Sequence, residues 1–246
     1  RDSSRNSDIN GNDGSDHDDH DDHDDNGDSD IVMHSVDHRF VSDNVITLIR
    51  SASLSVLLSM LRQPKYVSMG THELSFCLQY LMFWSEENEE VTGSSTSALS
   101  KKLGTLTYDT LTSMLEYRPH ALYTCASAYI LVTRSVLRVA LNQQSVAIRT
   151  HLTRYIARIF EEMSKDSHRN ALRHYCLYLL HESITGVLEH GWPEHAKDDL
   201  QQGLFCLLDV CTEYQSQMLF VGLNESGRSL LRKLRSQHQS QHVWTN

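Results

Sequence analysis

Proline is scarce in this sequence, with only Pro64, Pro119 and Pro193 among 246 residues. Runs of alternating β-branched residues, which are typical of a β-strand, are missing as well. Leucine is the most frequent residue after the first 30 positions, and apolar residues recur there at intervals of three and four. These features argue against a sheet protein and predict an all-α fold.

The sequence also lacks the short motifs that mark common catalytic and nucleotide-binding sites. It contains no GxxxxGK[ST] or GxGxxG for phosphate binding, no GxSxG for a serine nucleophile and no HExxH for zinc. His174 and His181 are seven residues apart, whereas a metal-binding pair on one helix would stand three or four apart. We interpret them as ordinary core or surface histidines, and we predict that the chain is not an enzyme and needs no cofactor.

Signals for membranes and disulfides are absent too. No apolar run approaches the roughly 20 residues that a membrane-spanning helix needs, and no signal peptide is visible. The cysteines are odd in number, none belongs to a CxxC pair, and each lies in an apolar helical context: Cys77, Cys125, Cys176, Cys206 and Cys211. We interpret them as reduced core thiols, which predicts a reducing compartment and no membrane partner.

The first 30 residues are a low-complexity acidic tract. Twelve Asp and two Arg in this tract account for the whole net charge of −10, so the remaining chain is neutral, which argues against nucleic acid as the main ligand. The tract buries too little apolar surface to offset the entropy of ordering, which predicts disorder. His17, His20 and His23 recur between aspartates, and they form either a weak metal-binding tract or part of a solvated acidic linker.

Residues 31–246 are predicted to form one helical domain. The periodicity of apolar residues predicts helices over 44–62, 71–84, 105–118, 145–163 and 167–190, with a further helix that begins at Pro119. Ser42 or Asp43 is suited to cap the first of these helices, and Gly104 weakens the third. Residues 85–98 are acidic and then small and polar, which predicts a flexible loop.

The first predicted helix carries apolar residues on two sides. One stripe contains Val45, Ile49, Ala52, Val56 and Met60, and the other contains Leu54, Leu58 and Leu61. Such a helix is expected to lie between two neighbours, as in layered helical repeats. Helix pairs follow one another about every 40 residues, in the range of HEAT and armadillo units. The sequence therefore predicts stacked antiparallel helices in an α-solenoid.

Residues 199–244 show the most regular spacing. Their first half carries a helical apolar stripe, made of Leu200, Gly203, Leu204, Leu207, Cys211 and Tyr214. Asn224 then stands where its side chain can cap a new helix. That helix directs leucines inward and basic residues outward or sideways, the latter being Arg228, Arg232, Lys233 and Arg235.

A distinctive order of residues runs through this stretch. A glycine in a Leu-rich helix is followed by Leu-Asp-Val-Cys at 208–211, an aromatic-rich turn, Leu-Asn-Glu-Ser-Gly-Arg at 223–228 and Trp244. In this order the stretch resembles the C-terminal domain of the Urb/Npa "unhealthy ribosome biogenesis protein two" family, also called nucleolar pre-ribosomal-associated protein two. The resemblance is clearest over 199–235 and continues more weakly upstream through 152–180, within a family-like part of about 118–246.

The resemblance implies a location and a role. Members of that family are large proteins of the nucleus and nucleolus that act in early pre-60S particles and pre-rRNA processing. Their partners include a second large helical scaffold and a DEAD-box helicase. The resemblance thus implies a non-catalytic scaffold of large-subunit assembly, and because the chain starts with Arg1 rather than Met, we expect it to be part of a longer protein. The alternative is a helical-repeat adaptor outside ribosome assembly that binds a peptide or an amphipathic helix.

Charge is divided unevenly along the helical part. Residues 118–173 carry a balance of +6, and residues 174–222 carry a balance of −6. Either neighbouring helices complement each other through exposed ion pairs, or a basic ridge faces ribosomal RNA while an acidic face meets a protein. The candidate contacts for RNA or a partner are Arg154 and Arg158, one turn apart on an exposed helix face, and the four basic residues at 228–235.

Overall fold

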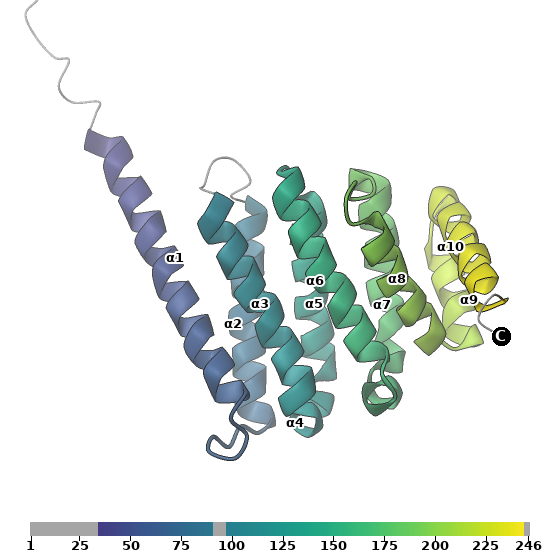
Figure 1. Ribbon diagram of the computed structural model, residues 1–246, viewed down its shortest axis with the longest axis horizontal. Helices are drawn as coiled ribbons and strands as arrows, with labels where there is room; N and C mark the ends of the chain where they lie inside the picture. Colours follow the sequence, from purple (N-terminus) through teal and green to yellow (C-terminus); the bar gives the residue numbers. More distant parts are fainter. Residues whose placement is uncertain (1–33, 91–96, 244–246) are drawn as a thin grey trace, which may run out of the picture. The chain divides into compact units, whose positions relative to one another are not determined.

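The computed structural model describes the backbone of residues 34–90 and 97–243, with side chains described for 45–82 and 101–240. Within these residues the chain forms ten α-helices and no strand, which confirms the all-α prediction (Figure 1). The helices are α1 (His34–Leu61), α2 (Thr71–Glu90), α3 (Ser97–Tyr117), α4 (Pro119–Thr124), α5 (Ala126–Asn142), α6 (Val146–Ser164), α7 (Asp166–His190), α8 (Lys197–Val210), α9 (Glu213–Gly222) and α10 (Glu225–Val243). The acidic tract of residues 1–30 lies outside the described residues.

Several helix boundaries differ from the predicted ones. Helix α1 begins at His34, so the predicted cap at Ser42 or Asp43 is wrong; no proline or glycine interrupts residues 34–61. Helix α2 continues to Glu90 and α3 begins at Ser97, so helices occupy both ends of the stretch expected as a loop at 85–98. The helix that starts at Pro119 breaks at Cys125, whose backbone angles of −115° and 27° leave the helical range.

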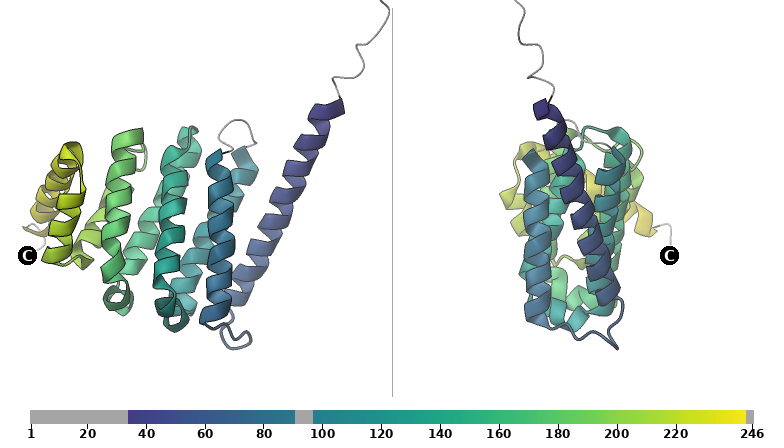
Figure 2. Two further views of the ribbon diagram at one scale, coloured as in Figure 1. Left: turned by 180° about the vertical axis from the view of Figure 1, so that it is seen from behind. Right: turned by 90° about the vertical axis from the view of Figure 1, so that its left-hand side faces the viewer.

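The chain divides after Ser42, and the second unit, Asp43–Asn246, contains all helices from α2 onward. Apart from the short helix α4, these helices pack in two layers (Figures 1 and 2). The front layer, which faces the viewer in Figure 1, has α3, α6, α8 and α10 side by side, and the rear layer has α2, α5, α7 and α9. Contacts of α5 with α6, of α6 with α7 and of α7 with α8 join the layers.

The core between the two layers consists mainly of aliphatic side chains. The apolar periodicity predicted for 145–163 is confirmed for Ile148, Leu152, Ile156, Ile159 and Met163, which are all buried on α6, whereas Tyr155 of the same arc is half-buried. Removal of such side chains from water is the main stabilising contribution, about 25 cal/mol for each Å² of apolar surface. The fold thus follows from apolar faces that two successive helices bury against each other.

Helix α1 buries one of its two predicted stripes. Leu54, Leu58 and Leu61 are buried, whereas residues of the other stripe are exposed, namely Val45, Ile49, Ala52, Val56 and Met60. The prediction that this helix lies between two neighbours is therefore wrong for the described residues. On its buried side, Arg118 fixes the end of the helix, because its guanidinium donates to the carbonyl oxygens of Met60 and Val67 at 3.0 and 2.7 Å.

Two glycines permit close helix packing in the front layer. A Cβ added at Gly203 of α8 would lie 3.0 Å from the Cα of Ala157 and 3.1 Å from its carbonyl oxygen on α6. A Cβ at Gly104 would lie 2.6 Å from a methyl group of Leu152. Gly104 is therefore an interior residue of α3 that brings this helix against α6, so the helix begins before Gly104 and not after it as predicted.

The cysteines are free thiols in buried or half-buried positions, as their apolar context predicts. Burial raises the pKa of the Cys176 thiol well above its ordinary value and that of Cys211 to about 11. Thiols of this kind are protonated and unreactive at neutral pH. None of the described helices combines the length and the apolar character that crossing a membrane requires.

Candidate interaction surfaces

Arg154 and Arg158 lie on the outer side of α6, and both are exposed, as predicted. Nε of Arg154 lies 3.0 Å from Oδ2 of Asp199 on α8, and the same guanidinium donates to the carbonyl oxygen of His195. The guanidinium of Arg158 lies 5.6 Å from the centre of the Tyr155 ring. Arg154 therefore joins α6 to the start of α8, while the charge of Arg158 is not matched by a carboxylate within the described residues.

Lys101 of α3 extends this positive surface. The imidazole of His151 lies beside it, and its pKa is lowered first by burial and then by the charges of Lys101, Arg154 and Arg158. A lowered pKa keeps His151 neutral at physiological pH. We call Lys101, Arg154 and Arg158 the basic patch of the front layer.

Arg228 has a structural role at the junction of α9 and α10. Its guanidinium donates to the carbonyl oxygens of Phe220 and Val221 at 2.9 and 3.2 Å, which satisfies free carbonyl groups at the end of α9. Asn224 caps α10 as predicted, because its Oδ1 accepts a hydrogen bond of 2.8 Å from the backbone nitrogen of Gly227. The hydrogen bonds of Arg228 thus join the start of α10 to the end of α9.

Two of the four basic residues predicted on this helix meet at a groove. The groove lies between α9 and α10, has a volume of about 530 Å³, and is lined by Ser216, Gln217, Phe220, Val221, Leu231, Arg232 and Arg235. The guanidinium of Arg232 lies 4.9 Å from the centre of the Phe220 ring. A cation placed above an aromatic face in this way is attracted to the ring. Lys233 is exposed but does not line the groove.

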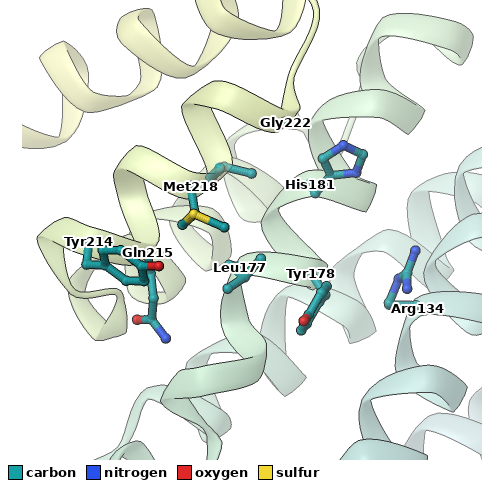
Figure 3. A pocket seen from close by; sticks show the side chains of 9 residues that line it. Arg134, Leu177, Tyr178, His181, Tyr214, Gln215, Met218 and Gly222 are labelled. Atoms are coloured by element: carbon teal, nitrogen blue, oxygen red, sulfur yellow. The ribbon is translucent and has the colours of Figure 1, made fainter.

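A second groove of about 450 Å³ separates α7 from α9 (Figure 3). Its lining residues are Arg134, Leu177, Tyr178, His181, Tyr214, Gln215, Met218, Leu219 and Gly222. Arg134 stands at the α5 edge, and Glu182 accepts from it at 2.7 Å and from Arg138 at 2.9 Å. Burial favours a higher pKa for the Glu182 carboxyl, but the hydrogen bonds and charges of Arg138 and Arg134 outweigh it and lower the pKa. Glu182 therefore offsets one of the two positive charges at this edge.

The outer face of α9 was missed from the sequence. Tyr214 is 70 % exposed, Met218 is 53 % exposed and Val221 is 73 % exposed. Tyr214 was expected in one buried stripe with Cys211, but α8 ends at Val210 and the chain starts a new helix there. The available signal was the capping box of Thr212 and Gln215, whose side chains each accept from the other's backbone nitrogen.

Ion pairs between helices support the interpretation that the basic residues of 118–173 and the acidic residues of 174–222 complement each other. Arg134 and Arg138 of α5 meet Glu182 of α7, and Arg154 of α6 meets Asp199 of α8. In each case a basic residue of 118–173 contacts an acidic residue about 45 positions later. Neighbouring helices within one layer therefore complement each other in charge.

Metal binding finds no support in the part of the chain that the structure describes. It contains no group of three or more His, Cys, Asp or Glu side chains that could hold a metal ion. His174 is exposed and His181 lines the groove between α7 and α9, so the two do not form a site. The tract with His17, His20 and His23 lies outside the described residues, and its metal binding stays a prediction.

Comparison with known families extends the resemblance seen at the C-terminal end. The family model described as the Urb2/Npa2 family matches residues 51–246. No curated protein and no solved structure gives a significant match. The match begins within α1 and reaches through α10, so it covers both layers of helices rather than the C-terminal part alone.

Proposed function

Because this chain belongs to the Urb2/Npa2 family, whose members take part in ribosome biogenesis, we propose that it is a non-catalytic scaffold of large-subunit assembly. In this proposal the chain acts in nucleolar pre-60S particles and in pre-rRNA processing. Its partners are other pre-60S assembly factors, among them a large helical scaffold and a DEAD-box helicase. The observation that carries the proposal is the family match over residues 51–246.

The arrangement of helices supports a scaffold role. Each successive pair of helices places one helix in each layer. The front layer therefore runs α3, α6, α8, α10, and the rear layer runs α2, α5, α7, α9. We assign this pattern to a HEAT-like α-solenoid, in which each repeat contacts its neighbours and the stack offers long binding surfaces. A scaffold acts through such surfaces, because it holds partners in register without bond-making chemistry.

Contact with pre-rRNA or with a partner protein is assigned to the basic residues. The basic patch of the front layer presents Arg158 and Lys101 to solvent, and α10 presents Arg232 and Lys233. Arg228 and Arg235 lie beside these two and are half-buried. Neutralising phosphates with such side chains gives a binding contribution that falls as salt rises.

Affinity purification tests the proposed function. The full chain is expressed with a tag in cells, purified from a nuclear extract and analysed by mass spectrometry, with a tag-only purification as the control. We expect enrichment of large-subunit assembly factors and pre-rRNA, nucleolar fluorescence of the tagged chain, and no nucleotide hydrolysis by the purified protein. Enrichment of partners unrelated to ribosomes would overturn the proposal.

A general adaptor function is the second candidate, and the apolar outer face of α9 favours it. Three exposed apolar side chains on one short helix suit the binding of another helix. Localisation separates the two candidates, because an adaptor for transport or signalling has no reason to concentrate in nucleoli.

A further inference from the structure

Helix α9 presents a continuous apolar row to solvent. Tyr214, Met218 and Val221 are four and three residues apart, so all three side chains lie on one side of the helix. All are more than half exposed, with Val221 at 73 %. Single exposed apolar residues are ordinary on protein surfaces, but a row at helical spacing marks a binding surface.

A groove flanks this row on each side. The groove between α7 and α9 has about 450 Å³ and adds Leu177 and Tyr178 to the apolar surface (Figure 3). The groove between α9 and α10 has about 530 Å³ and adds Phe220 and Leu231. A ridge with a groove on either side is the surface that a second helix packs against, because its own side chains enter the grooves.

The two grooves differ in charge. At the edge between α9 and α10, Arg232 and Arg235 contact no carboxylate in an ion pair among the described residues. At the edge between α7 and α9, the charge of Arg134 is already matched by Glu182. A ligand that complements this surface therefore carries acidic groups along one edge, the edge that faces α10.

We propose that α9 and its two grooves bind an amphipathic helix of a partner protein. The helix carries apolar residues at intervals of three and four, with Asp or Glu along the edge toward Arg232 and Arg235. The inference rests on the proposed scaffold function, because it assigns the chemistry of one partner and the place where that partner binds.

A single-stranded RNA fits the same surface less well. Nucleobases bind proteins through open aromatic faces, but the Phe220 ring already has guanidinium groups of Arg232 and Arg228 at 4.9 and 5.5 Å. Met218 and Val221 offer neither charge nor an aromatic face. A protein helix uses the whole row, whereas a nucleic acid uses the basic edge and the exposed rings of Tyr178 and Tyr214 but not Met218 or Val221.

Site-specific photocrosslinking tests this inference on the full chain in cells. The photoreactive residue p-benzoylphenylalanine replaces Val221 in one variant and Val146 in a control, which is 52 % exposed at the start of α6. Mass spectrometry then identifies the crosslinked partner and the crosslinked peptide. We expect the Val221 variant to capture a segment of another protein with helical apolar periodicity and an acidic edge, and the Val146 variant not to capture that segment.

Other outcomes overturn the inference. They are a crosslink from position 221 to RNA, a crosslink to a second copy of this chain, a crosslink to a segment without the acidic edge, and no crosslink at all. If the captured protein has no part in ribosome assembly, the docking surface stands and the proposed function fails. If RNA is captured, the docking inference fails while the proposed function stands.

A matched pair of charge reversals tests the basic edge. Arg232 and Lys233 are neighbours on α10, both are exposed, and only Arg232 lines the groove. In the crosslinking variant at position 221, Arg232→Glu is expected to lower the yield of the acidic segment about tenfold, whereas Lys233→Glu is expected to leave it within about twofold. Equal effects of the two reversals would show that the edge between α9 and α10 does not bind the acidic groups.

Discussion

The front and rear layers differ in what their outer sides expose. Among the described residues, the large exposed apolar side chains of the rear layer lie along its helices: Phe76 and Tyr80 on α2, Leu131 on α5, Tyr178 and Leu188 on α7, and the row on α9. Among the front-layer residues whose side chains the structure describes, only Tyr117 and Val146 are large, apolar and exposed, and both stand at a helix end. Basic groups occupy the outer side of α6 instead.

The layers also differ in packing toward the C-terminal end. In the front layer α8 approaches the backbone of α6 at Gly203, whereas in the rear layer α9 leaves an open groove against α7. A layer whose outer side faces solvent is stabilised by polar residues on that side and by close contacts between its helices. A layer that keeps apolar residues outside and leaves a groove has the features of a protein-binding surface.

A leucine at Gly203 is expected to have the largest effect on stability. Its side chain would collide with the backbone of Ala157, so we expect Gly203→Leu to lower the free energy of unfolding by about 3 kcal/mol. The control is Gly222→Leu, because a Cβ at Gly222 meets nothing within 4 Å; it should change stability by less than about 1 kcal/mol. Urea denaturation followed by circular dichroism measures both, and similar losses would contradict the tight contact of α6 with α8.

The sequence was sufficient for features that depend on local spacing. The single apolar arc of residues 145–163 predicted α6 to within one residue at each end, and Pro119 and Asn224 marked helix starts through the chemistry of their own residues. These predictions succeed because a helical stripe or a cap is decided within a few positions of the chain.

Features that depend on distant neighbours could not be predicted. Arg154 was predicted as a candidate contact for RNA or a partner, but its pairing with Asp199, 45 positions away, could not be foreseen. The two stripes of α1 look alike in sequence, and only the packing of other helices decides that Leu58 is buried and Val56 exposed. Tyr214 was placed in a buried stripe because periodicity continues across Cys211, where the backbone becomes extended. Surface sites are set by such tertiary contacts, so they were the least predictable part.

Binding of RNA is expected to distinguish the outer sides of the two layers. We expect Arg154→Glu with Arg158→Glu to weaken binding of a 30-nucleotide oligouridine by about tenfold at low salt and to make the plot of log affinity against log salt less steep. Met218→Gln with Val221→Gln should leave this slope unchanged, because the exposed row carries no cation and the change adds no charge. Filter binding at several salt concentrations measures both variants. If this slope is the same with and without the substitutions at Arg154 and Arg158, the basic patch contacts protein and not RNA.

Helix capping offers a smaller test, because the starts of α9 and α6 use different chemistry. Thr212 accepts from the backbone of Gln215 in a capping box, whereas the side chain of Ser145 makes no cap hydrogen bond at the start of α6. We expect Thr212→Ala to lower the free energy of unfolding by about 1 kcal/mol and Ser145→Ala to lower it by a few tenths at most. Hydrogen exchange should show faster opening of α9 in the first variant only. Uniform opening of every helix would mean that α9 does not unfold as a separate segment.

The ion pairs of the two layers give the smallest and most specific difference. Glu182 of the rear layer is 14 % exposed and bonds two arginines, while Asp199 of the front layer is 49 % exposed and bonds one. We expect Glu182→Gln to lower the free energy of unfolding by about 1 kcal/mol at pH 7 and Asp199→Asn to lower it by less than about 0.5 kcal/mol. Urea denaturation at a series of pH values measures both differences.

The pH dependence of the free energy of unfolding tests whether the charge of Glu182 causes this difference. The arginines lower the pKa of Glu182 in the folded protein below its ordinary value of 4.5. Its contribution is therefore fully present above that value and is lost as the pH falls through the lower folded-state pKa. The stability difference between the native chain and Glu182→Gln should stay constant from pH 8 to about pH 6 and shrink below about pH 4.5. A difference that persists unchanged in acid would show that the glutamine disturbs packing and that the charge of Glu182 does not hold α5 to α7.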